Sequence, residues 1–383
     1  MTTKQKPIQI LHVVGSMNRA GIESWLMNIL RNVDRTRYQM DFLVEEQEKA
    51  AFDDEIIKLG SKIYRVGSKR SANYSKRIRR ILSDYGPFDV VHSHMHFFDA
   101  VVLRAAAQSA VPVRISHSHN DTSIANLKRR GLRRFAEAVL RYGIYRYSTH
   151  RLAASQQAAD SLFGKYWLDN DSNKIVFCGV DFSPYAGEHR RKALRSEFGF
   201  EDQHWVIGNV GRFVDQKNQE FLVRSFAEVV REVDEARLLL IGIGPLRDVI
   251  EKIVQSMGVS DRVHFAGSRG DIPSLMCGVM DMFAFPSKHE GLGLALLEAQ
   301  AAGLPCLVSP AVPREADVVP ELITRVSIES SWRSAILAIR NKKRVPKVYV
   351  DRMLQSEFSI DRALENLCRV YSTTTQSYRI CHQ

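Results

Sequence analysis

The chain has 383 residues, with 54 Lys and Arg against 43 Asp and Glu and a net charge of +11. A hydrophobic content of 45% and a charged content of 25% are typical of globular proteins and exclude a largely disordered chain. This length favours two domains, and the basic surplus indicates nucleic acid, an anionic membrane or phosphorylated ligands as partners.

The five cysteines are scattered along the chain, which argues against a disulfide framework and a Cys-based zinc site. The first residues lack the pattern of a signal peptide. No apolar run approaches the about 18 residues that a membrane span needs. We therefore expect a cytoplasmic protein in a reducing compartment.

Strand-like and helix-like patterns alternate through the first half of the chain. We predict strands at 8–14, 40–44, 62–66, 89–92, 113–116 and 151–154, and helices at 22–33, 74–84 and 99–109. Such alternation predicts an α/β domain with a parallel sheet that is covered by helices on both faces.

Near Asp181 the rhythm breaks into a polar, turn-rich linker at 183–203, after which a second series begins. Its predicted strands are 205–210, 237–241, 262–266, 280–285 and 305–308, and its helices include 219–233 and 246–258. Residues 358–378 have helical spacing without a strand partner. We expect domains at 1–185 and 186–356, with 357–383 as a helix packed across the join. Ligands of such sheets bind at the carboxyl ends of the strands, in a cleft between two facing domains.

The first predicted strand ends in the loop GSMNRAG, which runs from Gly15 to Gly21 and opens a helix. Glycines permit close backbone approach, and a helix N-terminus offers free N–H groups to an anion. The spacing is not the three-glycine dinucleotide pattern. An ordinary loop without a ligand is an equally good interpretation.

The second series opens similarly, with Arg212 and Lys217 in a loop after the strand at 205–210. An Arg fork and a mobile Lys suit a diphosphate. The alternative is two solvated surface cations. The segment 241–246 adds another glycine-rich strand end to the same sheet.

Histidines alternate at two strand ends of the first domain: His92, His94, His96, His117 and His119. Alternate side chains of a strand share a face, so the set could bind a metal. No familiar metal-binding spacing accompanies it. We favour polar residues that line a cleft, ahead of core packing and of a metal site.

The segment HEGLGLALLE places Glu290 in a loop at the end of the predicted strand 280–285 and Glu298 in the helix that we expect to start near Leu292. Gly291 and Gly293 allow a sharp turn between the two acids. Carboxylates accept hydrogen bonds from paired hydroxyls, so both could grip a diol-rich ligand. The alternative for each acid is helix N-terminal charge complementarity or a surface salt bridge.

The stretch FPSKHEGLGLALLEAQAAGLPCLVS resembles the retaining glycosyltransferases of family 4, whose motif is two Glu separated by seven residues within P-S-x-x-E-G-x-G-x-x-x-L-E-A-x-A-x-G-x-P. GSMNRAGIESWLMNIL, CGVDFSPY, VGRFVDQKNQEFLVRSF and SRGDIPSLMCGVMDMFAFPS are similar to further segments of that family. Cys178 replaces the usual Asn of the linker entry, Ile243 a common acid and Leu292 a common Phe. The closest likeness is to bacterial capsule and exopolysaccharide enzymes. The resemblance implies the GT-B fold, two Rossmann-like doubly wound domains facing across a cleft.

The resemblance also implies residue roles. Glu298 would hold the nucleotide ribose, and Glu290 would contact the donor sugar at the reacting centre. Arg212 and Lys217 would neutralise the leaving diphosphate. His117, with His119 as the weaker candidate, would contact the donor sugar.

The remaining implied donor contacts come largely from the backbone. The residues concerned are Gly15, Gly21, Arg269, Gly270, Gly291, Leu292 and Gly293. Arg269 and Gly270 would lie near the base, and Gly21, with Gly15, near the phosphate or sugar. The family generally uses no metal for the chemistry, so no cofactor and no metal site are expected.

The implied reaction moves a sugar from a nucleotide diphosphate donor, taken as a UDP-sugar, to an acceptor hydroxyl with the anomeric configuration retained. The acceptor would be a saccharide on a polyprenyl diphosphate. Basic and aromatic residues interleave at 126–151, which suits an anionic membrane surface. We therefore expect peripheral attachment to the inner face of the cell membrane; a solvated helix is the alternative.

Two other functions fit part of the sequence. A sugar-nucleotide epimerase shares the two-domain architecture, but the acidic motif found here is not its signature. A nucleic-acid-binding protein is suggested by the pI of about 9.4 alone. The chain has no nucleic-acid-binding motif, so no nucleic acid partner is expected.

Overall fold

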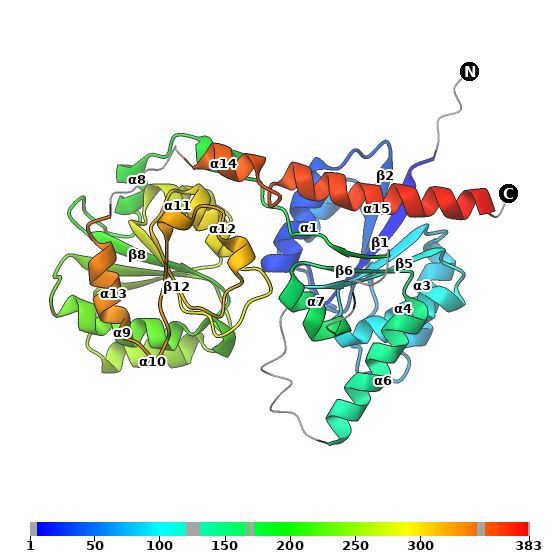
Figure 1. The fold of residues 1–383 in the computed structure, drawn as a ribbon, viewed down its shortest axis with the longest axis horizontal. Coiled ribbons are helices and arrows are strands. Elements are labelled where there is room, and N and C mark those ends of the chain that lie inside the picture. Colours follow the sequence, from blue (N-terminus) through cyan, green and yellow to red (C-terminus); the bar gives the residue numbers. More distant parts are fainter. Residues whose placement is uncertain (1–5, 120–130, 165–166, 168–171, 343–348, 382–383) are drawn as a thin grey trace. The chain divides into compact units, whose positions relative to one another are not determined.

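The computed structural model describes residues 6–119, 131–164, 167, 172–342 and 349–381. The chain forms two compact units (Figure 1). Unit 1 contains Met1–Gly179 and Ile360–Gln383, and unit 2 contains Val180–Ser359. The chain thus passes between units at 179/180 and at 359/360, whereas the sequence placed the boundaries at 185/186 and 356/357. The segment expected as a linker, 183–203, lies within unit 2.

Unit 1 has a seven-stranded parallel sheet with the order β3-β2-β1-β4-β5-β6-β7. Its strands are β1 (Ile8–Val14), β2 (Tyr38–Val44), β3 (Ile63–Arg65), β4 (Val90–Ser93), β5 (Val113–Ser118), β6 (His150–Ala153) and β7 (Asn173–Ile175). Its helices are α1 (Gly21–Asn32), α2 (Asp53–Lys58), α3 (Tyr74–Tyr85), α4 (Asp99–Gln108), α6 (Leu132–Tyr147), α7 (Gln156–Phe163) and α15 (Ile360–Cys381).

The last helix, α15, completes unit 1. It packs on α1, β1 and β5, which brings the red end of the chain beside its blue start (Figure 1). Leu367, Val370 and Tyr371 are at most 4% exposed, so these apolar residues anchor α15 in the core of unit 1. The segment predicted as a terminal helix is therefore helical, and its described contacts with the sheet lie in unit 1.

Unit 2 has a six-stranded parallel sheet with the order β10-β9-β8-β11-β12-β13. Its strands are β8 (Trp205–Val210), β9 (Ala236–Ile241), β10 (Val263–Gly267), β11 (Met282–Phe285), β12 (Cys306–Val308) and β13 (Ile323–Arg325). Its helices are α8 (Arg191–Ser196), α9 (Gln219–Val230), α10 (Arg247–Ser256), α11 (Ile272–Gly278), α12 (Leu294–Ala301), α13 (Trp332–Ile339) and α14 (Val350–Gln355).

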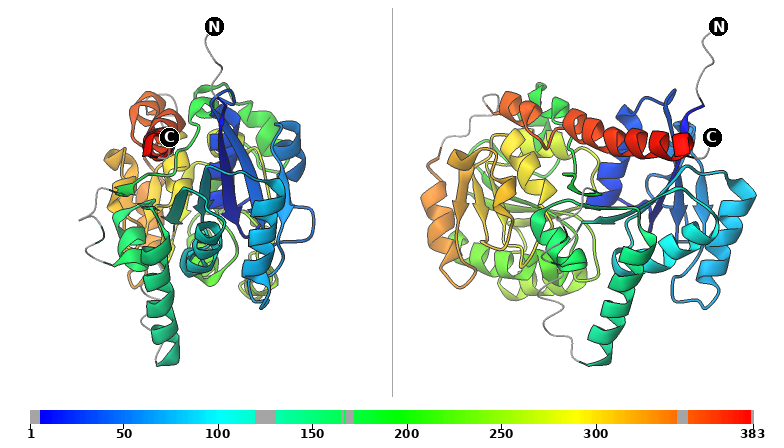
Figure 2. Two further views of the ribbon diagram at one scale, coloured as in Figure 1. Left: turned by 90° about the vertical axis from the view of Figure 1, so that its right-hand side faces the viewer. Right: turned by 45° about the vertical axis from the view of Figure 1, so that its right-hand side comes forward.

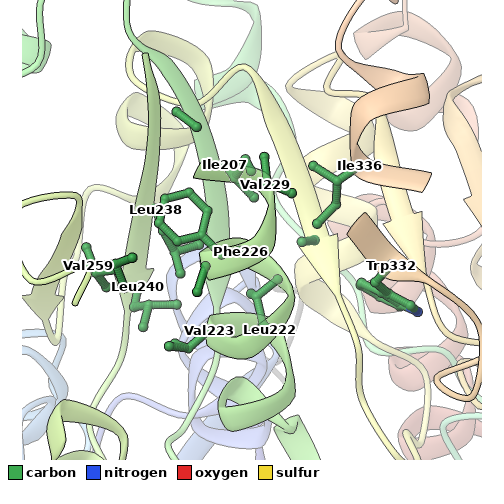
Figure 3. Close-up of a cluster of buried hydrophobic side chains, with 14 of the residues drawn as sticks. Ile207, Leu222, Val223, Phe226, Val229, Leu238, Leu240, Val259, Trp332 and Ile336 are labelled. Atoms are coloured by element: carbon green, nitrogen blue, oxygen red, sulfur yellow. The ribbon is translucent and has the colours of Figure 1, made fainter. Parts of the chain in front are cut away.

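The core of unit 2 lies between its sheet and the helices on one face (Figure 3). Ile207 and Leu238 of the central strands meet Phe226 of α9, and Trp332 of α13 packs on the same cluster. Strands buried on both faces read as continuous apolar runs, which is why β8 and β1 were predicted with their observed bounds.

Strand order reverses between β1 and β4 in unit 1 and between β8 and β11 in unit 2. In doubly wound sheets the loops that follow the strands at this switch point hold the ligand. Each unit therefore has one sheet edge where a site is expected. Within the described part of the chain, no helix is both long and apolar enough to cross a bilayer.

Candidate active site

Two loops at the switch point of unit 2 are bound to each other by hydrogen bonds. One follows β8 and the other follows β11. The Lys288 N–H donates to the Gln216 carbonyl at 2.8 Å, and the Gln216 side chain donates to the His289 carbonyl at 2.8 Å. Asn218, in the left-handed conformation before α9, donates to the Pro286 carbonyl at 3.2 Å. The two loops therefore hold their side chains as one assembly.

The glycine-rich loop after β9 packs against the loop after β8 without side chains between them. A Cβ on Gly242, whose φ is +141°, would lie 2.1 Å from the Gly211 carbonyl oxygen. A Cβ on Gly244 would lie 2.4 Å from the Phe213 carbonyl oxygen. Larger residues would push the loops apart, so both glycines are needed to place the segment around Arg212.

Lys217 and Glu290, separated by 73 positions, form the central ion pair of this assembly. The Lys217 Nζ lies 2.5 Å from the Glu290 Oε1, and Glu290 is 5% exposed. The stem of Lys217 crosses Gly211, where a Cβ would approach it to 3.3 Å, and its Nζ lies 5.0 Å from the centre of the Phe285 ring. The family resemblance implied separate partners for the two residues, whereas the structure brings them together.

Arg212 differs from Lys217 in its surroundings. Its side chain is exposed. Among the described residues, no hydrogen bond or ion pair of its guanidinium is found. Because Arg212 lies in the loop that carries Lys217, an exposed cation lies near a paired one. Such a combination can receive a bound anion.

The glycine turn between the two acids places a helix N-terminus beside the ion pair. Helix α12 begins at Leu294, two positions later than expected, because Gly293 adopts a left-handed conformation with φ +91° and serves as the N-cap. A Cβ on Gly293 would approach Val312 to 3.1 Å and Phe285 to 3.2 Å. No side chain caps the helix. Gly291 and Leu292 are buried in the turn, so their contribution to a ligand would come from the backbone.

Glu298 lies in α12 and contacts Tyr185, a residue that the sequence analysis missed. The Tyr185 hydroxyl donates to the Glu298 Oε1 at 3.1 Å. Glu298 keeps part of its surface exposed, yet desolvation of its carboxyl raises its pKa to about 7, against the opposing effect of the Tyr185 hydrogen bond. Tyr185 is 113 positions from Glu298, and no spacing rule would have linked them.

Arg269 and Gly270 follow β10. The Arg269 guanidinium is engaged by two carboxylates, at 2.5 Å from Glu197 and at 2.8 Å from Asp271. The hydrogen bonds that Arg269 donates to Asp271 and Glu197 raise the pKa of its guanidinium. Gly270 is exposed. With its side chain occupied, Arg269 offers a ligand mainly its backbone, which is the kind of contact that the resemblance implies for this position.

Gly15 and Gly21 flank the loop after β1 in unit 1. The Gly15 carbonyl accepts hydrogen bonds from the Glu45 and Glu46 N–H groups, and a Cβ on Gly15 would meet nothing within 4 Å. Gly21 is the first residue of α1, whose N-terminus has no side-chain cap. The loop therefore leaves space and free N–H groups at a helix start, as an anion site requires.

His117 lies in a buried layer of five histidines in unit 1. The layer, hereafter the histidine layer, consists of His12, His92, His94, His117 and His119, which are between 0% and 8% exposed. His117 itself is 1% exposed, with Trp25 of α1 at 5.3 Å between ring centres. The contact of His117 with a donor sugar stays a prediction. His96 lies outside the layer, in a turn with φ +57°.

The fold and the unit 2 site define a class. Doubly wound parallel sheets with uncapped helix starts at their switch points are typical of proteins that bind nucleotides, and the basic side chains of unit 2 suit a phosphorylated ligand. Two family models match the chain: "Glycosyltransferase Family 4" over residues 19–183 and "Glycosyl transferases group 1" over residues 190–342.

Full-length relatives extend this match. The "Putative glycosyltransferase EpsF" of Bacillus subtilis is 31% identical over 98% of this chain and 99% of its own length. The "Capsular polysaccharide biosynthesis glycosyltransferase CapH" of Staphylococcus aureus is 23% identical over 96% and 99%. The chain belongs to glycosyltransferase family 4 and is a glycosyltransferase, with a relative that is named for capsular polysaccharide biosynthesis.

Solved structures agree on the fold. Anabaena HepE in complex with UDP and glucose superposes with a TM-score of 0.79 at 17% identity, covering 96% of this chain and 100% of HepE. The chain therefore has the GT-B fold, as the sequence predicted.

Proposed function

We propose that this enzyme transfers a sugar from a UDP-sugar to a hydroxyl of a lipid-linked saccharide, with retention of the anomeric configuration. The observation that carries the proposal is the Lys217–Glu290 pair beside Arg212 and the uncapped start of α12. It combines positive charge for a diphosphate with a carboxylate at the same strand ends. The binding of UDP and glucose by HepE, a protein of the same fold, supports the choice of donor.

In this proposal the diphosphate binds to cations and not to a metal. Arg212 would contact the diphosphate from the solvent side, and Lys217 would contact it from the protein side. The free N–H groups at the start of α12 would point toward the diphosphate. Negative charge grows on the diphosphate as the glycosidic bond breaks, so preorganised cations stabilise the transition state more than the ground state. The cationic residues of this site therefore replace the charge that a bound metal would supply.

Glu290 would act at the sugar. Its carboxylate is fixed by Lys217 and lies on the turn that opens α12. A negative charge there stabilises the positive charge that develops at the anomeric carbon. Because the carboxylate is already paired with Lys217, we do not assign it the role of nucleophile. The diphosphate would leave and the acceptor hydroxyl would attack on the same face of the sugar, so the anomeric configuration is retained. A diphosphate oxygen would take the proton of the acceptor hydroxyl.

Glu298 would hold the ribose. It lies on the rigid helix α12, and Tyr185 donates to one of its oxygens, which leaves the other free for a hydroxyl. Ribose binding changes little between ground state and transition state, so this contact contributes to donor affinity. Tyr185 is a positioning residue because it acts through Glu298.

The experiment is a donor screen. Nucleotide release is measured with UDP-, GDP- and ADP-sugars and a polyprenyl diphosphate saccharide, and the product's anomeric signal is recorded by NMR. We expect turnover with a UDP-sugar and retained configuration. Turnover with a GDP- or ADP-sugar alone, or an inverted product, contradicts the donor or the stereochemical assignment.

A matched control variant separates the effect of losing Lys217 from the effect of losing any positive charge in these loops. Lys288 lies in the same pair of loops and forms an ion pair with the exposed Asp215 at 2.5 Å. We expect Lys288→Ala to keep turnover near that of the parent, whereas Lys217→Ala loses it. An equal loss in both variants would contradict a specific role for Lys217.

We further propose that α6 attaches the enzyme to an anionic membrane. Phe135 and Tyr142 are 70% exposed and Val139 is 53% exposed, at helical spacing on one face. Arg134 and Arg146 of the same helix are also exposed. The N-terminal end of α6 projects beyond the other elements of unit 1 (Figure 2). Exposed aromatic rings with adjacent cations suit the interface of an anionic bilayer. The basic residues 128–130 lie outside the described residues.

Vesicle co-sedimentation tests the attachment. Phe135→Ser with Tyr142→Ser should reduce binding to anionic vesicles, and salt should reduce it in the parent. Ile57→Ser, at a residue of α2 that is 62% exposed, is the matched control. Binding that is unchanged in the α6 variant, or absent in the parent, rules the attachment out.

A further inference from the structure

The histidine layer is an unusual way to fill the interior of a parallel sheet. His12 of β1 and His92 of β4 are register partners, and His117 of β5 projects from the same face by the alternation of strand side chains. His94 and His119 directly follow β4 and β5. Helices α1 and α15, which cover this face, contribute Trp25 and Tyr371. Positions of this kind normally hold Val, Ile or Leu.

The rings contact one another through their nitrogens. The His94 Nδ1 lies 2.8 Å from the His119 Nε2, and the His94 Nε2 lies 3.1 Å from the His12 Nδ1. The His117 Nδ1 lies 3.1 Å from the His92 Nε2. The His117 Nε2 is buried and has no side-chain partner among the described residues, and the His117 ring also has a backbone hydrogen bond with Val176.

We propose that His94, His117 and His119 bind one divalent late transition-metal cation of the zinc or cobalt type. One ring nitrogen of each lies within 4.8 Å of those of the other two. Tetrahedral ligation with metal–nitrogen distances of about 2.0–2.1 Å separates ligand nitrogens by about 3.3 Å. Binding would lengthen the 2.8 Å distance between the His94 Nδ1 and the His119 Nε2 toward that spacing, and would turn the His117 and His119 rings, whose centres lie 4.0 Å apart, toward the cation.

The outward nitrogens of the three ligands are already oriented by buried partners. When the His117 Nε2 binds the cation, its Nδ1–H donates to His92, whose own Nδ1 lies 2.7 Å from the Tyr371 hydroxyl. The second nitrogen of a histidine ligand almost always has such a partner, which fixes the tautomer.

The other two ligands have the same arrangement. When the His119 Nε2 binds, its Nδ1–H faces the Cys178 sulfur at 3.4 Å. When the His94 Nδ1 binds, its Nε2–H donates to the His12 Nδ1. Every ring stays neutral with one proton, and the cation replaces the His94–His119 hydrogen bond.

A second triad, His12 with His92 and His94, also has ring nitrogens within 4.8 Å. It is the poorer site. Both nitrogens of His92 already have partners outside that triad, Tyr371 and His117. The outward Nε2 of His12 has none among the described residues, so nothing fixes its tautomer. The site with complete outer hydrogen bonds is therefore the one that contains His117.

The cation would lie inside unit 1, beneath α1, and would link the end of β4 to the end of β5. It is not required for the proposed transfer chemistry, which uses the cationic residues of unit 2. The Nε2 of His117 can bind either the cation or a donor sugar. Metal binding thus gives an alternative to the sugar contact that the family resemblance implies for this residue.

The test is cobalt titration of the untagged, full-length chain after treatment with EDTA. We expect about one equivalent of Co²⁺ with the visible absorption of a tetrahedral site, and its displacement by Zn²⁺. His94→Gln, His117→Gln and His119→Gln should each weaken binding by about 100-fold or more, and His12→Gln by about tenfold. His204→Gln, in unit 2, is the control and should bind as the parent does.

The parent alone keeps the proposal falsifiable if a variant does not fold. Zn²⁺ should raise the Tm of the parent, and EDTA should reverse the rise. No cobalt signal from the parent, or an unchanged signal in the three ligand variants, overturns the proposal. Glu290→Gln should retain the cobalt signal while losing transfer, so failure of the metal site and failure of the proposed function are distinguishable.

Discussion

The histidine layer of unit 1 and the ion-pair loops of unit 2 lie at equivalent places, the switch points of two similar sheets, but use opposite chemistry. The layer is built from neutral rings that are at most 8% exposed. The loops present Arg212 to solvent and hold Lys217 against Glu290. In the first case all the side chains belong to the core, whereas in the second a buried Glu290 and a partly buried Lys217 lie beside an exposed Arg212. The comparison teaches that an equivalent position in a fold does not fix the role of the residues placed there.

If this comparison holds, Trp25→Ala should destabilise the protein strongly. Trp25 is 1% exposed and packs its ring on His94, His117 and His119. Loss of a buried Trp costs about 3–5 kcal/mol of unfolding free energy. Chemical denaturation measures the effect, and Tyr142→Ala on the exposed face of α6 is the control. A change below about 1 kcal/mol would show that the layer is not part of the core.

In unit 2, Arg212→Ala and Lys217→Ala should reduce activity more than stability. Each should lower kcat/KM by an amount that corresponds to about 2–4 kcal/mol of transition-state stabilisation. For Arg212, unfolding free energy should change by less than about 0.5 kcal/mol, because its side chain is exposed. Steady-state kinetics and denaturation on the same preparations check both. Near-normal turnover in both variants removes the phosphate role.

Glu290→Gln and Glu298→Gln distinguish the roles of the two acids of unit 2. Glu290→Gln should mainly lower kcat and Glu298→Gln mainly raise the donor KM. Because Lys217 and Glu290 are paired, the double variant Lys217→Ala/Glu290→Gln should lose less than the sum of the two single losses, by about 0.5–3 kcal/mol. The reverse assignment of kcat and KM effects, or strict additivity, would contradict these roles.

The smallest expected effect is a pH dependence of donor binding. Burial raises the pKa of Glu298 to about 7 in the folded enzyme, so the ribose-binding carboxylate forms only as the pH rises through that value. UDP-glucose affinity should therefore increase by up to about tenfold between pH 6 and pH 8. Calorimetric titration measures it, and Glu298→Gln should remove the dependence. The same shift means that this carboxyl lowers folding stability as the pH rises from its unfolded pKa toward about 7.

Continuous apolar runs predicted the bounds of the strands better than any other feature of the sequence. The strands 8–14 and 205–210 have the predicted bounds, since each is buried on both faces. The edge strands β7 and β13 escaped prediction because each has three residues and is only partly buried. The helix start at Leu294 differed from the expected Leu292 because the left-handed Gly293 becomes the N-cap.

Site residues could be named from the sequence, but their partners could not. The acidic motif and the family resemblance indicated Glu290 and Glu298. The pairing of Glu290 with Lys217 and of Glu298 with Tyr185 depends on how distant loops meet, which local spacing does not encode. Alternation predicted that the histidines of β4 and β5 share a face. It did not predict His12, which a neighbouring strand adds.

The return of α15 to unit 1 has a consequence for biosynthesis. Unit 2 is encoded entirely before residue 360, whereas unit 1 needs the last 24 residues of the chain. On the ribosome, unit 2 can fold while the face of unit 1 that receives Leu367 and Tyr371 is still uncovered. The N-terminal unit is thus the last to be completed. A chain that stops before residue 360 would therefore leave incomplete the unit that is synthesised first.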